Sequence, residues 1–500
     1  MGRQRMDMVR ARLAASGPFV VVGLVVAAAH LIGIRRPAPW LDEAATVLSA
    51  WRTLPGLLAL LAHHDAVHGV YYLLAWVWGH VFGGSVVSLR VMSALVVGVG
   101  AGLIAWLGDL LGSRRAGLLA AVAWALLPRT LWTSVEARSY ALSATLVTAC
   151  MILFVLATRD VGGEGRTGRR GAWVRYATGL VVTVWVMLFN AFAFAALPVV
   201  IALTRRGRAV WRSWLVATGA AALVCLPIAL VVRRQQSFLT GSAPPVDWGV
   251  MLARAVTDVA YLPLHDPIGR RLSPVWLAVE VVVLVVAVVA CRRGGDATFR
   301  SVFLLAWLIV PVVVLVGWSL YARMDLTPRY AVGTTPALAL LIGFAADGAL
   351  TRLRGWWPRA VLVILAVAVA IPGWIAQRAP DLNGDYGRMA EVVARHKQPG
   401  DVLIAGPMGR SSVIRLMPEP FEGVPTINIR KAYWQRADLY DTFDSVADHP
   451  ELLDDHQRIW FWAAGDRVKE QSEDFTRHGY VPVISEKGAP ISVVLFEKQG

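Results

Sequence analysis

The stretch PFVVVGLVVAAAHLIGIRRPAPWLDE, residues 18–43, joins an apolar run at 18–34 to two adjacent acids, Asp42 and Glu43. The run approaches the roughly 20 residues that a helix needs to cross a bilayer, so we predict a first membrane span there. Acids just outside a span indicate a functional site, because they are costly there unless water or a cation solvates them. We interpret the pair as a catalytic centre; the first turn of a helix at 43–50 is the equal alternative.

Apolar runs of this kind recur along the chain. Of its 500 residues 56% are hydrophobic, which predicts an all-α polytopic membrane protein and excludes a soluble enzyme. The formal charge of +15 would suggest nucleic acid in a soluble protein, but much of the arginine lies between apolar runs, where it sets topology. We therefore expect the lipid bilayer as a partner and no nucleic acid. The three cysteines lie in or beside apolar runs and offer neither metal-ligand spacing nor a disulfide framework.

The lengths of the runs predict about eleven membrane-spanning helices. They are expected at 18–34, 87–107, 116–133, 139–158, 174–189, 190–204, 211–232, 273–291, 301–320, 331–347 and 359–376. The basic N-terminus before the first run is followed by no small-residue cleavage site, so we expect that run to be retained. The aromatic-rich segment 69–82 is too short to span comfortably and is typical of a helix at the membrane interface.

Charge placement decides the topology. With 69–82 outside, the basic groups all fall on one side, which the positive-inside rule makes cytoplasmic. These groups are Arg3/Arg5/Arg10/Arg12, Arg114/Arg115, Arg166/Arg169/Arg170, Arg205/Arg206/Arg208, Arg292/Arg293 and Arg352/Arg354. The external residues are then 35–86, 134–138, 233–272, 321–330 and 377–500. We predict a multi-pass protein of the cell (plasma) membrane with a cytoplasmic N-terminus and an extracytoplasmic C-terminal domain.

The composition changes near Pro380. From there on the long apolar runs stop, and all five lysines of the chain occur in this part. The pattern predicts helices at 386–396 and 467–478 and strands at 401–406, 458–462, 480–485 and 490–497. Alternating helices and strands favour a small soluble α/β domain, so we divide the chain into a membrane domain, 1–379, and an extracytoplasmic domain, 380–500. The turn at 406–409 lacks the glycine spacing of a phosphate loop.

Histidines and an acid follow the acid pair in the first external loop. His64 and His68 are four residues apart, so a helix would place them on one face, where with Asp65 they could hold a metal. We favour contact of His64, Asp65, His68 and Tyr72 with a substrate phosphate or sugar, since histidine at an interface is commonly wet and amphipathic.

Three later positions complete the polar set. Glu136 and Arg138, next to Tyr140, lie at a span boundary and form either a weak interfacial ion pair or a group that orients a polar substrate. Arg329 precedes Tyr330, a residue of the interfacial belt, and an arginine fork suits a phosphate head group; a snorkelling anchor is the alternative. Glu280, inside an apolar run, is expected to pair with an arginine of the bundle.

The ordered motifs resemble the GT-C glycosyltransferases, and more closely the family 39 type that includes protein O-mannosyltransferases and the aminoarabinose and RgtA/B/C/D-like transferases. The resemblance covers roughly residues 18–375. It is carried by Asp42-Glu43, His68 with Tyr71-Tyr72, Leu89-Arg90, Glu136-Ala137-Arg138-Ser139-Tyr140 and Arg329-Tyr330. The tail resembles extracellular domains of actinobacterial members. One departure is His68-Gly69-Val70, where the family has a His-Pro-Pro stretch.

The resemblance implies an enzyme that takes a sugar, mannose or another hexose or pentose, from a polyprenyl-phosphate donor. The sugar is transferred with inversion to an acceptor hydroxyl of a glycolipid, polysaccharide or protein on the external face. Asp42 would remove the acceptor proton with Glu43 as helper or sugar ligand. Arg329, then Arg138 and His68, would stabilise the leaving phosphate, in one hollow with the acids and without a metal cofactor.

Two other classes stay open at this point. A lipid-linked sugar flippase or a secondary transporter would also be polytopic with buried charge, although transporters tend to show internal repeats, and we find none in the sequence. A non-catalytic scaffold that displays the C-terminal domain is the third possibility.

Overall fold

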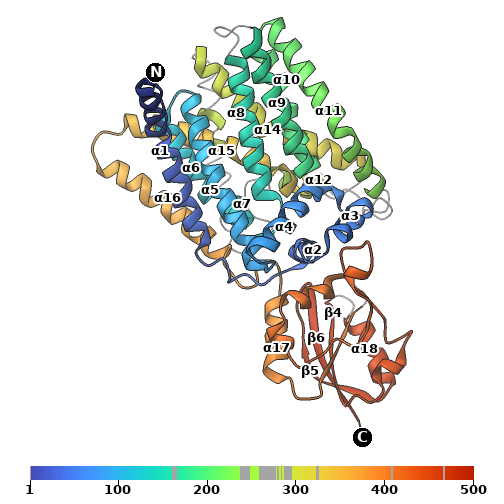
Figure 1. Ribbon diagram of the computed structural model, residues 1–500. Coiled ribbons are helices and arrows are strands. Elements are labelled where there is room, and N and C mark those ends of the chain that lie inside the picture. The colour runs from blue at the N-terminus through green and yellow to red at the C-terminus, as the bar shows by residue number, and fades with distance from the viewer. Residues whose placement is uncertain are drawn as a thin grey trace. The chain divides into compact units, whose positions relative to one another are not determined.

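The computed structural model describes residues 2–159, 166–236, 248–257, 278, 281–282, 284–286, 295–322, 326–406, 409–465 and 468–499 (Figure 1). The predicted span at 273–291 is thus described only in fragments, and Glu280 lies outside the described residues. The chain divides into two compact units. Unit 1 comprises Met1–Ile32, Val67–Tyr71 and Val91–Gln377, and unit 2 comprises Gly33–Ala66, Tyr72–Arg90 and Arg378–Gly500.

Unit 1 is helical. Its elements are α1 (Gly2–Leu31), η1 (Ala66–His68), α5 (Val86–Leu110), α6 (Arg114–Leu126), α7 (Pro128–Ser134), α8 (Tyr140–Arg159), α9 (Arg166–Val186), η3 (Leu188–Ala195), α10 (Ala196–Leu203), α11 (Arg208–Gln236), α12 (Trp248–Thr257), α14 (Gly295–Ala322), η4 (Pro328–Thr334), α15 (Thr335–Arg352) and α16 (Trp357–Ala376). Because lipid offers the backbone no hydrogen-bond partners, long apolar segments satisfy their own amides as helices.

Five helices among the described residues are long and apolar enough to cross a membrane. They are Val86–Leu110, Tyr140–Arg159, Arg208–Gln235, Asp296–Ala322 and Pro328–Arg352. The pair Arg114–Leu126 and Pro128–Ser134 adds a sixth if it counts as one span, bent by 66°. Pro128 explains the bend, since it has no N–H and disfavours a helical residue before it.

The predicted count of eleven is therefore not confirmed. The runs at 18–34, 174–189, 190–204 and 359–376 are helical, in α1, α9, η3 with α10, and α16, but do not meet the same test of length and hydropathy over the described residues. The run at 190–204 is interrupted because its start belongs to the 3-10 helix η3. The segment 69–82 forms one helix, α4 (Gly69–Phe82), with the predicted bounds.

Close approach of α1 and α5 depends on small residues. A Cβ on Gly98 would lie 2.5 Å from the carbonyl oxygen of Gly23 and 2.6 Å from the Cβ of Ala27, too close for any side chain. Helices in membranes pack closely where such residues face each other. Glycine at these positions therefore sets the distance between the two helices.

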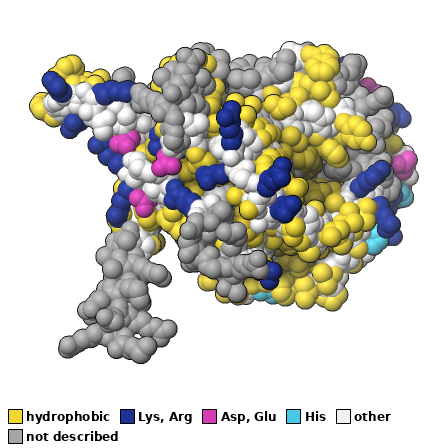
Figure 2. All heavy atoms as spheres, turned by 90° about the horizontal axis from the view of Figure 1, so that it is seen from above, with side chains coloured by type: hydrophobic (Ala, Val, Ile, Leu, Met, Phe, Trp, Pro, Cys, Tyr) yellow, Lys and Arg dark blue, Asp and Glu magenta, His cyan; other side chains and the backbone are white. Residues whose placement is uncertain are grey.

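One end of unit 1 collects arginines. Arg115 pairs with Asp347 at 2.8 Å, Arg300 donates to the carbonyl of Leu111 at 3.4 Å, and Arg206 lies 4.7 Å from the ring of Phe299. These contacts join α15 to the start of α6, the end of α5 to the start of α14, and the link between α10 and α11 to the start of α14. Figure 2 shows basic side chains spread over the face seen from above, with fewer acidic ones. Arg115 and Arg206, which belong to two of the predicted basic groups, thus lie at this end of unit 1, while the side of a membrane that this end faces stays a prediction.

Unit 2 combines the first loop with the C-terminal region. Its elements are α2 (Leu41–Ala50), α3 (Leu54–His63), most of α4, α17 (Tyr386–His396), β1 (Val402–Ala405), η5 (Gly409–Leu416), η6 (Glu419–Phe421), β2 (Ile429–Lys431), η7 (Tyr433–Gln435), β3 (Thr442–Phe443), η8 (Pro450–Leu453), β4 (Arg458–Ala464), α18 (Val468–Arg477), β5 (Tyr480–Glu486) and β6 (Ile491–Lys498). The predicted helices and strands of the tail are confirmed to within about two residues, the usual uncertainty of element ends.

The sheet of unit 2 has the order β1-β4-β6-β5, with β1 and β4 parallel and the other pairs antiparallel. Leu403 lies opposite Trp460, which lies opposite Leu495. Helices α17 and α18 lie on opposite sides of the sheet (Figure 1). Alternate residues supply the two cores, as period two in a strand requires. A small α/β layer, as predicted, is the result.

Candidate functional site

The acid pair lies in the first turn of α2. The two acids have different surroundings, since Glu43 is fully buried and Asp42 is partly exposed. An acid in the first turn also interacts favourably with the helix dipole. The position at the start of a helix, which was the alternative to a catalytic centre, is therefore present. Only Asp42 is accessible enough to meet a substrate in the state described.

Arg90 at the start of α5 holds Glu43. Its Nε donates to Oε1 at 2.7 Å and its Nη2 to Oε2 at 2.6 Å, while the two side chains are 1% and 0% exposed. Nη1 donates to the carbonyls of Pro37 at 2.8 Å and Ile34 at 3.2 Å. A bidentate fork with both partners buried fixes orientation as well as charge. Arg90 therefore ties α2 to the chain that leads into it, a role that the sequence did not assign.

The shared helical face that a continuous helix would give His64 and His68 is not formed. Helix α3 ends at His63, Asp65 has a left-handed backbone with φ of 51°, and His68 belongs to the separate turn η1. His64 is exposed, whereas Asp65 accepts a hydrogen bond from the hydroxyl of the buried Tyr72. The left-handed residue reverses the chain, so spacing of four no longer means one face. Among the described residues no group of three or more His, Cys, Asp or Glu side chains is suited to hold a metal ion.

His68 lies at the centre of a basic cluster in unit 1. It is 1% exposed, its Nδ1 and the hydroxyl of Ser139 form a 2.8 Å hydrogen bond, and its ring meets Tyr140 edge-on at 6.2 Å. Burial, and then the cations of Arg138 and Arg329, hold the pKa of His68 well below 6.5. The ring is therefore neutral at neutral pH.

The other members of this cluster come from the link between α7 and α8 and from η4. Glu136 and Arg138 are both buried, and the hydroxyl of Ser93 donates to the carbonyl of Glu136 at 2.8 Å. The guanidinium carbon of Arg329 lies 5.7 Å from the centre of the Tyr140 ring. Two arginines near one buried histidine make this part of unit 1 electropositive, which favours an anionic ligand.

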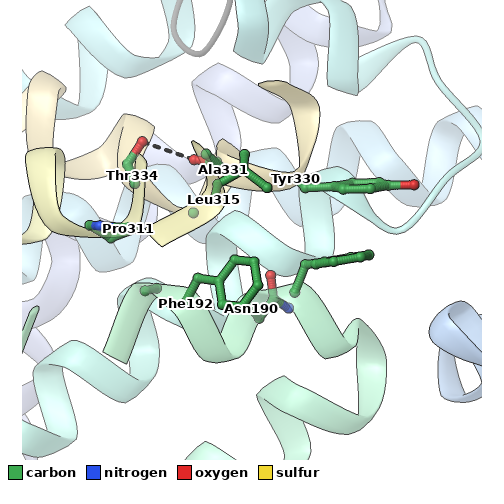
Figure 3. A pocket seen from close by; sticks show the side chains of 10 residues that line it. Asn190, Phe192, Pro311, Leu315, Tyr330, Ala331 and Thr334 are labelled. Carbon is green, nitrogen blue, oxygen red and sulfur yellow. Dashed lines mark hydrogen bonds between the residues drawn. The ribbon is translucent and has the colours of Figure 1, made fainter. Parts of the chain in front are cut away.

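Tyr330 leads from this cluster to an apolar hollow. Its ring stacks on Phe189 at 4.3 Å, with an angle of 9° between the planes. The hollow is small and is lined by residues of η3, α14 and η4, among them Asn190, Leu315 and Thr334 (Figure 3). The hydroxyl of Thr334 donates to the carbonyl of Ala331 at 2.8 Å, so that wall of the hollow presents few free polar groups.

The cluster and the arginine end lie at opposite ends of the same helices. Helix α8 runs from Tyr140 to Arg159 and is 20 residues long. At 1.5 Å per residue this separates the two ends by about 30 Å, the thickness of the hydrocarbon core of a bilayer. The two ends of α8 are thus far enough apart to reach the head-group regions on the two sides of a membrane.

Sequence reasoning missed Ser139 as a partner of His68 and passed over Arg129. Arg129 is 3% exposed in the first turn of α7, and its guanidinium carbon lies 5.3 Å from the centre of the Trp132 ring. A charged residue inside the apolar run at 116–133 was the available signal, because such residues are rare and mark functional or structural ion sites.

No protein-family model matches the sequence, and no curated protein matches it. Solved structures do. ArnT from Cupriavidus metallidurans in the apo state superposes with a TM-score of 0.59 at 14% identity, covering 97% of this chain and 98% of that chain. The same enzyme bound to undecaprenyl phosphate gives 0.58 with the same identity and coverage. The Archaeoglobus fulgidus oligosaccharyltransferase tethered with an acceptor peptide gives 0.50 at 11% identity, covering 81% of this chain and 63% of that chain.

At these identities the likeness concerns the fold alone, and it extends over nearly the full length of both ArnT and this chain. The chain has the GT-C fold that the ordered motifs predicted.

Proposed function

We propose that this protein is a membrane glycosyltransferase that takes a sugar from a polyprenyl-phosphate donor and transfers it to an acceptor hydroxyl. The observation that carries the proposal is the cluster in which the ring of Tyr140 lies 6.2 Å from the buried His68 and 5.7 Å from the guanidinium carbon of Arg329, with the buried Arg138 two residues away in the sequence. The fold around it is shared over nearly the full length of ArnT. A phosphodiester-like head group needs such cations, and one ArnT structure contains undecaprenyl phosphate.

In the proposed reaction the acceptor oxygen attacks the anomeric carbon of the donor sugar from the face opposite the phosphate. A carbon–oxygen bond forms to the acceptor, the bond to the phosphate oxygen breaks, and the configuration inverts. Asp42 takes the acceptor proton, and the electron pair leaves on polyprenyl phosphate. A positioned carboxylate contributes typically a factor of about 10²–10⁴ to such a step.

We propose that Glu43 positions Asp42. Because both of its oxygens accept from Arg90, we assign it the role of orienting the first turn of α2, in place of direct contact with the sugar. Arg329 is the first candidate for the donor phosphate, followed by Arg138 and His68. The neutral imidazole of His68 is suited to hydrogen bonding with the phosphate and not to charge pairing. Asp65 and Tyr72, joined to each other, remain candidates for sugar contact, as does the exposed His64.

The donor sugar is proposed to be mannose or another hexose or pentose, and the acceptor a glycolipid, a polysaccharide or a protein. The arginine end of unit 1 is assigned to the cytoplasm and the His68 cluster to the external face, since positive charge flanks spans on the inside. The C-terminal domain is then extracytoplasmic, and the protein a multi-pass component of the cell membrane. No metal or nucleic acid is part of the proposal.

The test of transfer uses purified protein, labelled polyprenyl-phosphate-mannose and a cell-envelope extract. Transfer of label is expected with the wild type and with Asp381→Asn, an isosteric change at an exposed acid. It should fall by a factor of about 10²–10⁴ with Asp42→Asn, while the unfolding midpoint is unchanged. An unchanged product profile for Asp42→Asn would remove Asp42 as the base.

The donor side has its own test. Binding of undecaprenyl phosphate in detergent is expected to weaken by about tenfold or more in Arg329→Ala, since a hydrogen bond to a charged group is worth about 1.5–3 kcal/mol. Arg395→Ala, which removes an exposed arginine on α17, is the matched control and should bind as the wild type does. Equal binding by the two variants contradicts a phosphate site at Arg329.

A further inference from the structure

Helix α2 is part of the core of the C-terminal α/β layer. Ala44 and Leu48, both fully buried, belong to the same hydrophobic cluster as Val393 of α17, Val413 of η5 and Trp460 of β4. Burial of this kind contributes roughly 25 cal/mol per Å² of apolar surface. The helix that carries the proposed base is therefore packed as an element of that layer, although the rest of the layer is far away in the sequence.

Arg52, directly after α2, bonds to the layer at the C-terminal end of the helix. It is 4% exposed, its Nη1 donates to the carbonyl of Arg436 at 2.9 Å, and its Nη2 donates to the carbonyl of Asp438. Its guanidinium carbon lies 5.2 Å from the centre of the Tyr433 ring. Burial lowers the pKa of Arg52, while Tyr433 and nearby acids oppose that shift. One side chain thus satisfies two main-chain acceptors and stacks on an aromatic ring.

The segment that Arg52 reaches is itself held in place. Arg415 forms a bidentate pair with Asp441, at 2.6 and 3.1 Å, and the backbone N–H of Tyr433 donates to Asp441 at 2.9 Å. Arg415 also lies 5.6 Å from the ring of Tyr433, the ring that Arg52 contacts. The acceptors for Arg52 therefore belong to an ordered part of the layer.

A second contact lies at the other end of α2. The hydroxyl of Tyr440 donates to the carbonyl of Leu41 at 3.3 Å, one residue before Asp42. Residues 433–441 thus bond to α2 at its first residue and just after its last. Two contacts about ten residues apart fix both the axis and the rotation of a short helix, and rotation decides where Asp42 points.

We propose that the C-terminal layer is a positioning module for Asp42, which acts through Arg52 at one end of α2 and Tyr440 at the other. The inference rests on the proposed function for its catalytic half. Neither residue touches the reacting atoms; both act through α2. Misplacement of a catalytic group by about 1 Å costs on the order of a hundredfold in rate, so this clamp has a measurable consequence.

The experiment compares full-length Arg52→Ala, Arg52→Lys and Tyr440→Phe with Arg458→Ala. Arg458 is the matched control because it pairs with Asp401 at 2.9 Å inside the same layer and is not among the contacts to α2. Hydrogen exchange of the amides at 44–52 is measured first, since it needs no substrate. We expect it to accelerate by about tenfold or more in Arg52→Ala, less in Tyr440→Phe, and to stay at the wild-type rate in Arg458→Ala.

Turnover is measured next on the same proteins. Arg52→Ala should lower kcat by about ten- to a hundredfold with the KM for the donor unchanged, and Arg52→Lys should recover little because lysine lacks the fork. Exchange at 44–52 that is equal in Arg52→Ala and Arg458→Ala overturns the inference, as does a loosened α2 with wild-type kcat. A wild-type protein without transfer activity refutes the proposed function instead, and the exchange result stands apart from it.

Discussion

The buried pair of Glu43 and Arg90 supports a quantitative prediction. Removing one partner of a buried ion pair costs about 3–5 kcal/mol, because the other charge is left uncompensated. Both side chains here are almost completely buried and joined at 2.6 and 2.7 Å. For a unit of this size a loss of 1 kcal/mol lowers the unfolding midpoint by about 2–4 °C. Glu43→Gln and Arg90→Met should therefore each lower it by about 6–20 °C.

The double variant Glu43→Leu/Arg90→Met separates charge from hydrogen bonding. Apolar replacement of both partners often restores stability or exceeds it, since no charge is left buried. Here Arg90 also donates to the carbonyls of Ile34 and Pro37, and each buried acceptor left open costs about 1–3 kcal/mol. We expect the double variant to lie between the wild type and the single variants.

The midpoint is measured in detergent at one scan rate, because unfolding of membrane proteins is commonly irreversible. Glu391→Gln is the control. It breaks a pair of almost the same length, 2.7 Å to Arg395, whose side chains are 66% and 68% exposed. An exposed pair of this spacing is worth at most about 0.5 kcal/mol. If Glu43→Gln shifts the midpoint no more than Glu391→Gln does, the assigned role of the buried pair is wrong.

Three further predictions use other features. The pKa of His68 is held well below its unfolded value of 6.5, so its contribution to stability is complete above pH 6.5 and is lost as pH falls toward the folded pKa; His68→Gln should make the unfolding midpoint less dependent on pH below 6.5, and the same dependence on pH in the variant and the wild type contradicts this. His64→Ala should leave undecaprenyl phosphate binding unchanged, because His64 is exposed at the end of α3, whereas His68→Ala should weaken it; equal effects in a binding titration would show that both contact the lipid. Gly98→Val should lower the thermal midpoint in detergent by an amount that corresponds to about 1–3 kcal/mol, since any Cβ meets the carbonyl of Gly23, and a neutral Gly98→Val would show that α1 and α5 can move apart without cost.

Much of the local structure followed from the sequence because its signals lie between near neighbours. Short apolar segments marked the strands of the tail, a helical pattern marked α17, and the aromatic run 69–82 had the bounds of α4. The count of spans failed where short runs adjoin, since 3-10 turns and bends such as the one before Pro128 are decided by packing. Whether a helix continues from His64 to His68 could not be predicted, because the break at Asp65 is a non-glycine residue with positive φ, which has no dependable sequence signal.

By itself, then, the sequence determined that this is a helical protein with several apolar helices long enough to cross a membrane and a small C-terminal α/β layer, since hydropathy acts through composition along the chain. Only the tertiary structure decided that Arg90 holds Glu43, that Ser139 and Tyr140 contact His68 with Arg329 on the same tyrosine ring, and that α2 belongs to the core of the C-terminal layer. These partners are separated by tens to hundreds of residues. Which buried charge meets which depends on how elements pack, and packing is a property of the whole fold.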